Sequence, residues 1–193
     1  MAIDTYGSAA AVSQVVVNAS GHITSGTNVA LGSGTASSNT FLRGDQTYAR
    51  MWNLILKTAD ETITSDSTLS PDNTLVLALA ANTKYRFRFV VHVVSSSTPN
   101  FKYRLTGPAS PTVLTFDDFL NTTAAGSSET LRSAYHAADV SVGTNTQAFI
   151  VLEGVVHNGA NTGNLSFEWA QNTSNGASTT VLAGSSLEYA VVV

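Results

Sequence analysis

Two segments near the middle of the chain alternate apolar and polar residues with a period of two, which is typical of a β-strand with one buried face. They cover residues 85–94 and 100–106. The apolar positions share one face of each predicted strand: Tyr85, Phe87, Phe89, Val91 and Val93 in the first, and Phe101, Tyr103 and Leu105 in the second. Arginine, lysine and histidine alternate with them, so the opposite faces should meet solvent.

Three more strands are predicted nearer the end of the sequence. Residues 149–156 are apolar almost throughout and predict a more deeply buried strand. Residues 164–171 alternate again, with Leu165, Phe167 and Trp169 on one face. The last strand, 186–193, is expected in a core or at a subunit contact, because an exposed apolar strand promotes aggregation. Its apolar face comprises Leu187, Tyr189, Val191 and Val193. Shorter strands are predicted over 52–58, 62–64, 74–80, 112–116 and 131–142.

Turn-forming residues separate these strands, and no stretch shows a sustained helical period, so we expect less than about a tenth of the chain in helix. The composition agrees, with 23 Ser, 25 Thr, 14 Asn and 14 Gly, which favour strands and turns over helices. Eight to ten strands without intervening helices predict an all-β sandwich. Several connections are too long for tight hairpins, which favours a jelly-roll β-sandwich over residues 51–193.

Residues 1–50 differ from the rest of the chain. They are rich in Gly, Ser and Thr and carry only Asp4, Arg43, Asp45 and Arg50 as charges, which cancel. Their scattered Val, Ile and Leu side chains cannot form a core, so a lone copy should be disordered. If this segment is ordered, a partner or further copies of itself must bury it. We therefore predict an extended, low-complexity N-terminal arm or stalk over residues 1–50.

The charge balance limits the partners. Nine Lys and Arg against 13 Asp and Glu give a net charge of −4, which argues against nucleic-acid binding. The absence of cysteine excludes disulfides, thiolate metal sites and a cysteine nucleophile. No apolar run is long enough for a membrane span, and no signal peptide is visible, so membrane insertion is not expected.

Candidate catalytic or metal-ligating residues are few. The four histidines, His22, His92, His136 and His157, do not have metal-ligand spacing and are expected to be surface or interface residues. Asp139 follows His136 by three residues, which on a strand places the two on opposite faces. Asp117 and Asp118 are adjacent, so a strand would point them apart; on a turn they could bind Ca²⁺, but no third acidic residue is close.

The sequence also shows no clear pair of carboxylates for acid–base catalysis. A glycosidase needs two carboxylates across a cleft, and Glu153, Glu168 and Glu188 all fall on outward positions of predicted strands. The tripeptide Arg43-Gly44-Asp45 matches a cell-adhesion motif, although a simple turn explains it as well. We predict a protein that is not an enzyme, with no catalytic, cofactor-binding or metal-binding residues and no cofactor.

The stretch 32–49, which reads GSGTASSNTFLRGDQTYA, resembles a linker that recurs in tailed-bacteriophage fibre proteins. The preceding turn, 17–24, is similar to turns found before that linker. Further segments resemble a domain of phage structural proteins and the trimeric jelly rolls of the tumour-necrosis-factor type. They are 85–89, 101–108, 152–156, 169–172 and 183–185.

The resemblance implies a location in the virion and a homotrimer, and it supplies no catalytic residues. It favours a short fibre or appendage that contacts other virion proteins of the tail, collar or head, with a host surface glycan or receptor as a further expected partner. The alternative is a capsid decoration protein, whose trimers stabilise the head at threefold or quasi-threefold sites. Three copies of residues 1–50 could bury together what one copy cannot.

Overall fold

The computed structural model describes residues 11–30, 41–42, 48–49, 52–96, 98–123, 126–142 and 147–192. The chain divides into two units, residues 1–51 and 52–193. The Arg43-Gly44-Asp45 motif, the whole glycine- and serine-rich stretch 31–40, and Val193 lie outside the described residues. The described residues contain strands and turns but no helix, so the all-β prediction is confirmed.

The first unit contains two short pairs of antiparallel strands. β1 (Ala11–Val17) pairs with β2 (Ile23–Ala30), and β3 (Phe41–Leu42) pairs with β4 (Tyr48–Ala49). Asn18 closes the first hairpin, because its Oδ1 accepts hydrogen bonds from the amides of Ser20 and His22. Val16, Val17 and Ile23 are between 50% and 66% exposed beside this turn. That these side chains are buried by other copies of the chain stays a prediction.

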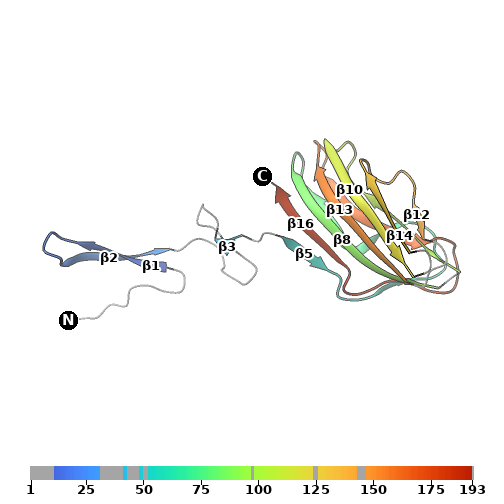
Figure 1. Ribbon diagram of the computed structural model, residues 1–193, viewed down its shortest axis with the longest axis horizontal. Coiled ribbons are helices and arrows are strands. Elements are labelled where there is room, and N and C mark those ends of the chain that lie inside the picture. Colours follow the sequence, from blue (N-terminus) through green and yellow to red (C-terminus); the bar gives the residue numbers. More distant parts are fainter. Residues whose placement is uncertain are drawn as a thin grey trace. The chain divides into compact units, whose positions relative to one another are not determined.

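The second unit contains a larger and a smaller antiparallel sheet. The larger sheet begins with β11 (Gly126–Arg132), β10 (Val113–Thr122), β13 (Gln147–His157) and β8 (Lys84–Ser95). Beyond β8, one row continues through β15 (Thr179–Val181) to β6 (Glu61–Ile63), and the other through β16 (Ser186–Val192) to β5 (Asn53–Leu56). Figure 1 shows β16, β8, β13 and β10 side by side.

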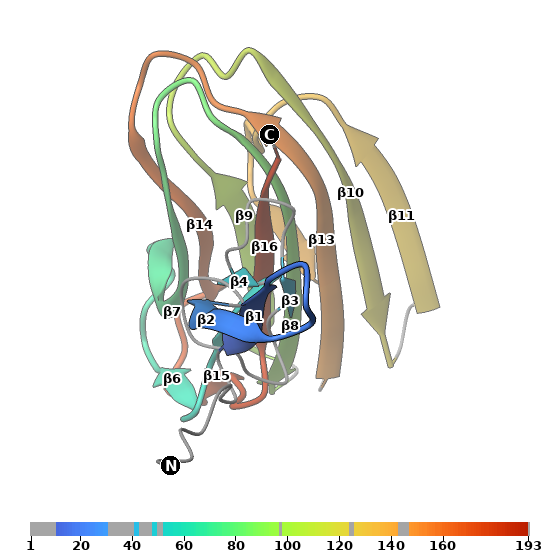
Figure 2. The ribbon, with the colours of Figure 1, turned by 90° about the vertical axis from the view of Figure 1, so that its left-hand side faces the viewer.

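The smaller sheet has the order β12 (Val140–Val142), β9 (Phe101–Thr106), β14 (Gly163–Gln171) and β7 (Ser70–Leu79). Figure 2 shows β7 and β14 in one layer, whereas β8, β13, β10 and β11 belong to the other layer. From β7 to β16 the chain crosses between the sheets at every connection except the β10–β11 hairpin and the β15–β16 turn. This alternation gives the jelly-roll order that the sequence predicts, with the β10–β11 hairpin widening the larger sheet.

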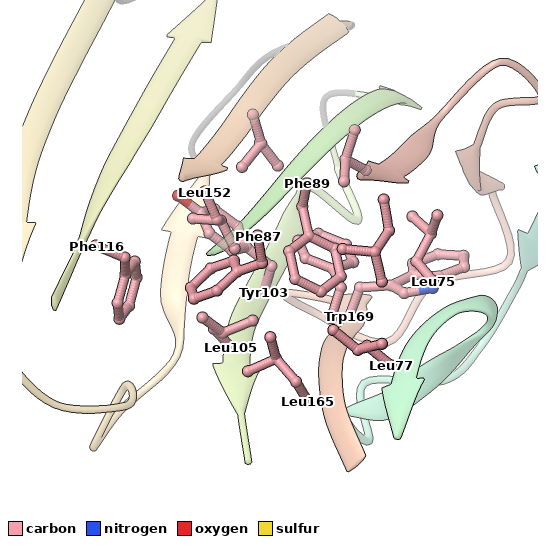
Figure 3. Close-up of a cluster of buried hydrophobic side chains, with 14 of the residues drawn as sticks. Leu75, Leu77, Phe87, Phe89, Tyr103, Leu105, Phe116, Leu152, Leu165 and Trp169 are labelled. Carbon is pink, nitrogen blue, oxygen red and sulfur yellow. The ribbon is translucent and has the colours of Figure 1, made fainter. Parts of the chain in front are cut away.

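The core lies between the two sheets and is built from the faces that alternation predicts. All five apolar residues of β8 and all three of β9 on the predicted faces are buried. Figure 3 shows this cluster, in which the Phe87 and Phe89 rings from the larger sheet meet Tyr103 and Trp169 from the smaller one. Aromatic contacts bind the layers together; the ring centroids of Phe89 and Phe167 are 6.4 Å apart.

Two strand predictions need correction. The predicted strand 131–142 is wrong as a single element, because β11 ends at Arg132 and β12 begins at Val140. The intervening loop turns inward and carries His136 into the core. The predicted strand 112–116 is too short, since β10 continues to Thr122, and the three-residue β15 was missed.

The last strand is only partly covered by the sandwich. β16 lies inside the larger sheet between β8 and β5, and Leu187 is fully buried. Further along the same face, however, Val191 is 53% exposed. The apolar end of this strand is therefore left open by the second unit itself.

Candidate functional site

The outer faces of the two sheets differ in polarity. Every large hydrophobic side chain that is exposed on the second unit, among the residues described, lies on the larger sheet or immediately before it. These residues are Trp52, Leu54, Leu56, Val94, Val113, Leu131, Val155, Val191 and Val192, of which Val191 lies on the same face of β16 as the buried Leu187. The outer face of a solvated sheet is expected to be polar, so this distribution indicates a surface that contacts another molecule.

Strand register joins several apolar side chains into a row across the larger sheet. Val90 of β8 lies opposite Val151 of β13, which lies opposite Phe119 of β10. On the other side of Val90, Ser186 of β16 leads to Leu56 of β5. We call the outer surface of β5, β16, β8, β13 and β10, from this row toward Arg88 and Val155, the contact face. β13 thus carries apolar side chains on both faces, which explains its almost continuous apolar sequence.

A charged row runs parallel to the apolar one. Arg88 lies opposite Glu188 on one side and Glu153 on the other, and Glu153 lies opposite Asp117. Nε of Arg88 is 3.3 Å from Oε2 of Glu153, and both side chains are close to half exposed. A hollow of about 550 Å³ opens here, lined by Arg88, Glu153 and Asp117 together with apolar residues such as Phe119. The contact face therefore carries both signs of charge along one side of an apolar strip.

The most connected polar cluster lies inside the sandwich, around Asp118. Its Oδ1 accepts a hydrogen bond from the Tyr103 hydroxyl at 2.6 Å. Its Oδ2 accepts from Nε of Arg132 at 2.9 Å and lies 2.9 Å from Nε2 of His136. Nδ1 of His136 accepts the backbone N–H of Leu105, so Nε2 carries the proton that is shared with Asp118. The cluster joins β10, the end of β11, the following loop and β9.

The electrostatics of this cluster keep it assembled. Burial raises the pKa of Asp118, but the hydrogen bonds from His136, Tyr103 and Arg132 outweigh burial and hold that pKa below its usual value. Burial, followed by the charge of Asp118, raises the pKa of the Tyr103 hydroxyl, which stays a donor. None of these four residues lines either described cavity, and each of the interactions is internal. The arrangement is suited to holding strands together rather than to catalysis.

A second buried ionic cluster lies near the start of the second unit. Nζ of Lys57 is 2.9 Å from Oδ2 of Asp72 and 2.5 Å from Oε2 of Glu61. Burial lowers the pKa of Lys57, yet the hydrogen bonds to Glu61 and Asp72 together raise it above its usual value. Oδ1 of Asp72 also accepts the amides of Thr74 and Leu75, so the cluster fixes the start of β7.

The histidines do not all follow the sequence prediction. His22 and His92 are exposed and His157 is half-buried, but His136 is buried, so its assignment as a surface or interface residue is wrong. Its ring enters the core because Asp118 and the Leu105 amide supply partners there. The part of the chain that the structure describes holds no group of three or more His, Asp or Glu residues placed to bind a metal ion.

The acidic candidates lie apart. Asp117 faces solvent while Asp118 is buried, as predicted for adjacent residues of a strand. Glu153 and Glu188 flank Arg88 on the larger sheet. Glu168 lies on the smaller sheet, where Arg104 and the Thr106 hydroxyl hold its carboxylate. The outward positions predicted for these three glutamates are confirmed.

Comparisons with known proteins establish neither a family nor a shared fold. No protein-family model and no curated protein matches the chain. Among solved structures, it is similar to a chain of infectious bursal disease virus, Gt strain, with 10% identity and a TM-score of 0.20, covering 86% of this chain and 45% of that one. For the Gx strain the identity is 8% and the TM-score 0.18, covering 74% of this chain and 40% of that one. This chain therefore spans less than half the length of either, and TM-scores this low do not establish a shared fold. No helix that could cross a membrane occurs among the described residues.

Proposed function

We propose that this protein is a structural component of a bacteriophage virion, a short homotrimeric fibre or appendage that acts by assembly and not by catalysis. The observation that carries the assembly is the contact face, an apolar strip with mixed charges on one sheet only. The resemblance of residues 32–49 to fibre linkers supports the phage virion. The internal pairing of the Asp118 cluster agrees with a role that needs rigidity.

Further copies of the same chain are the occupants we assign to the contact face. The face carries Arg86 and Arg88 next to Glu153, Glu188 and Asp117, so two copies can place unlike charges opposite each other. The apolar strip beside these charges supplies area that association removes from water. A strongly basic or acidic partner would leave half of these charges unmatched.

A charge placed in the apolar strip tests this assembly. Val151 and Val76 are both half-buried valines on outer sheet faces, the first on the larger sheet and the second on the smaller. Light scattering after size exclusion should give the wild type and Val76→Glu the mass of three 20.1 kDa chains, and Val151→Glu the mass of one. A wild-type monomer at micromolar concentration, or an intact Val151→Glu trimer, would contradict the contact face.

Location in the particle tests the virion role. Immunogold labelling and quantitative mass spectrometry of purified phage particles should find the protein at the tail or collar in tens of copies or fewer. Hundreds of copies spread over the head would favour the capsid decoration protein instead. Its absence from particles would refute both forms of the proposal.

A further inference from the structure

A pocket of about 300 Å³ lies at the end of β8, β10 and β13, next to the contact face. Phe149 and His92 both line it, and their ring centroids are 4.9 Å apart with an interplanar angle of 67°. These two residues lie opposite each other in the sheet, and Asn121 is the partner of Phe149 on the next strand. Gln147, one pair further along β13, and Leu182 also line the pocket.

The pocket is suited to an uncharged ligand. No Lys, Arg, Asp or Glu side chain lines it, although such residues line the neighbouring hollow. An ionic ligand would lose hydration without gaining a counter-charge. The volume lies at the small end of the range for ligand pockets, which fits one or two ring-sized groups.

The lining also offers free hydrogen-bonding groups beside an aromatic face. Within the part of the chain that the structure describes, the side chains of His92, Asn121 and Gln147 have no hydrogen-bond partner. A carboxamide supplies two donors and an acceptor, so Asn121 and Gln147 can bind hydroxyl groups in either sense. The negatively polarised face of Phe149 attracts C–H groups that carry partial positive charge.

We propose that this pocket binds a neutral saccharide unit, with its C–H face on Phe149 and its hydroxyls on Asn121 and Gln147. A pyranose ring has an apolar C–H face and a rim of hydroxyl donors and acceptors, which matches both halves of the lining. The inference deepens and rests on the proposed function, because a virion appendage with a saccharide site can attach to a glycan-covered surface.

Binding to an immobilised glycan array tests the pocket. The array carries glycans that end in neutral hexoses or N-acetylhexosamines, together with acidic glycans that end in sialic or uronic acids. The full-length protein should bind neutral glycans in preference to acidic ones. Asn121→Ala and Phe149→Leu should weaken binding at least tenfold, whereas Phe149→Tyr, which keeps the aromatic face, should retain it. Asn164→Ala, at an exposed position of the smaller sheet, is the matched control and should bind as the wild type does.

Three results would overturn the proposal that this pocket binds a neutral saccharide. They are no binding to any glycan on the array, preference for acidic glycans, or binding that Asn121→Ala and Phe149→Leu leave unchanged. Circular dichroism and the mass in solution of each variant show whether a loss comes from unfolding or disassembly. Failure of the pocket is separable from failure of the virion role. If particles carry the protein but the array shows no binding, only the saccharide site is refuted. If the protein binds glycans but is absent from particles, only the virion role is refuted.

Discussion

Replacing Asp118 with alanine should destabilise the sandwich severely, because three side chains lose a shared acceptor. Asp118 accepts the Tyr103 hydroxyl at 2.6 Å and Nε of Arg132 at 2.9 Å, and Nε2 of His136 lies 2.9 Å from its Oδ2. Tyr103 is fully buried, and so is the side chain of His136. The alanine variant therefore leaves two buried donors without a partner and Arg132 without a counter-charge.

The magnitude follows from the burial of each group. An unsatisfied buried donor costs about 1–3 kcal/mol, and two are created. Arg132 is 30% exposed and can turn to water, so its loss contributes less. We expect a decrease of about 3–5 kcal/mol in the free energy of unfolding for Asp118→Ala. Asp118→Asn keeps an oxygen for Arg132 and His136 and an amide for the Tyr103 oxygen, so it should cost about 1–2 kcal/mol.

Urea unfolding at a fixed protein concentration, followed by tryptophan fluorescence, measures these differences. Asp117→Ala is the matched control, because Asp117 is the exposed neighbour on the same strand and should change stability by less than about 0.5 kcal/mol. Equal effects of the two alanine substitutions would refute the assignment of a structural role to the buried cluster.

The pH dependence of stability gives an independent test of the same group. The folded state holds the pKa of Asp118 below its usual value of 3.8, so its contribution is complete above that value. It is lost as the pH falls below 3.8 through the lower pKa of the folded state. The wild type should therefore lose stability over this window more steeply than Asp118→Asn does. Parallel pH profiles for the two proteins would contradict the direction of the shift.

Two further substitutions test other parts of the core. Lys57→Met leaves the fully buried Asp72 carboxylate without its cation and should lower the free energy of unfolding by about 3 kcal/mol in urea at neutral pH; a change below about 1 kcal/mol would contradict this. Gly154→Ala would place a methyl group 2.2 Å from the Thr115 carbonyl oxygen of the neighbouring strand, so thermal unfolding should show a loss of about 1–3 kcal/mol. Gly176→Ala meets no atom within 4 Å and serves as its control.

The sandwich was predictable where one face of a strand is buried and the other is solvated. β8 and β9 meet that condition, and their alternation identified both the strands and the buried faces. β13 does not, because Phe149 and Val151 lie on its outer face while Ile150 and Leu152 fill the core. A strand buried inside one protein and a strand at a subunit contact both have an apolar run of this kind, so the sequence does not distinguish them. The contact face could be recognised only from the register of the strands in the sheet.

The sequence allows the inward direction of Asp118 to be predicted, but not the residues that bind it. Leu114, Phe116, Asp118 and Leu120 repeat with a period of two, which continues the strand past its predicted end and points Asp118 inward. A buried carboxylate requires donors, but its partners come from β9, β11 and the loop before β12. His136 was misassigned because its burial depends on these distant contacts and not on its neighbours in sequence.

The position of the cluster explains why a polar group occupies that part of the core. The β10–β11 hairpin extends the larger sheet beside β13, and six of the seven residues of β11 are exposed, so apolar packing can hold little of this hairpin. Asp118 ties β10 to Arg132 at the end of β11, to His136 in the loop that returns to the smaller sheet, and to Tyr103 within that sheet. Hydrogen bonds are directional, whereas apolar contacts tolerate sliding, and a shift of one residue would turn Asp118 to the other face of the sheet. The cluster therefore fixes the register of the hairpin and, with it, the position of Phe119 at the edge of the contact face.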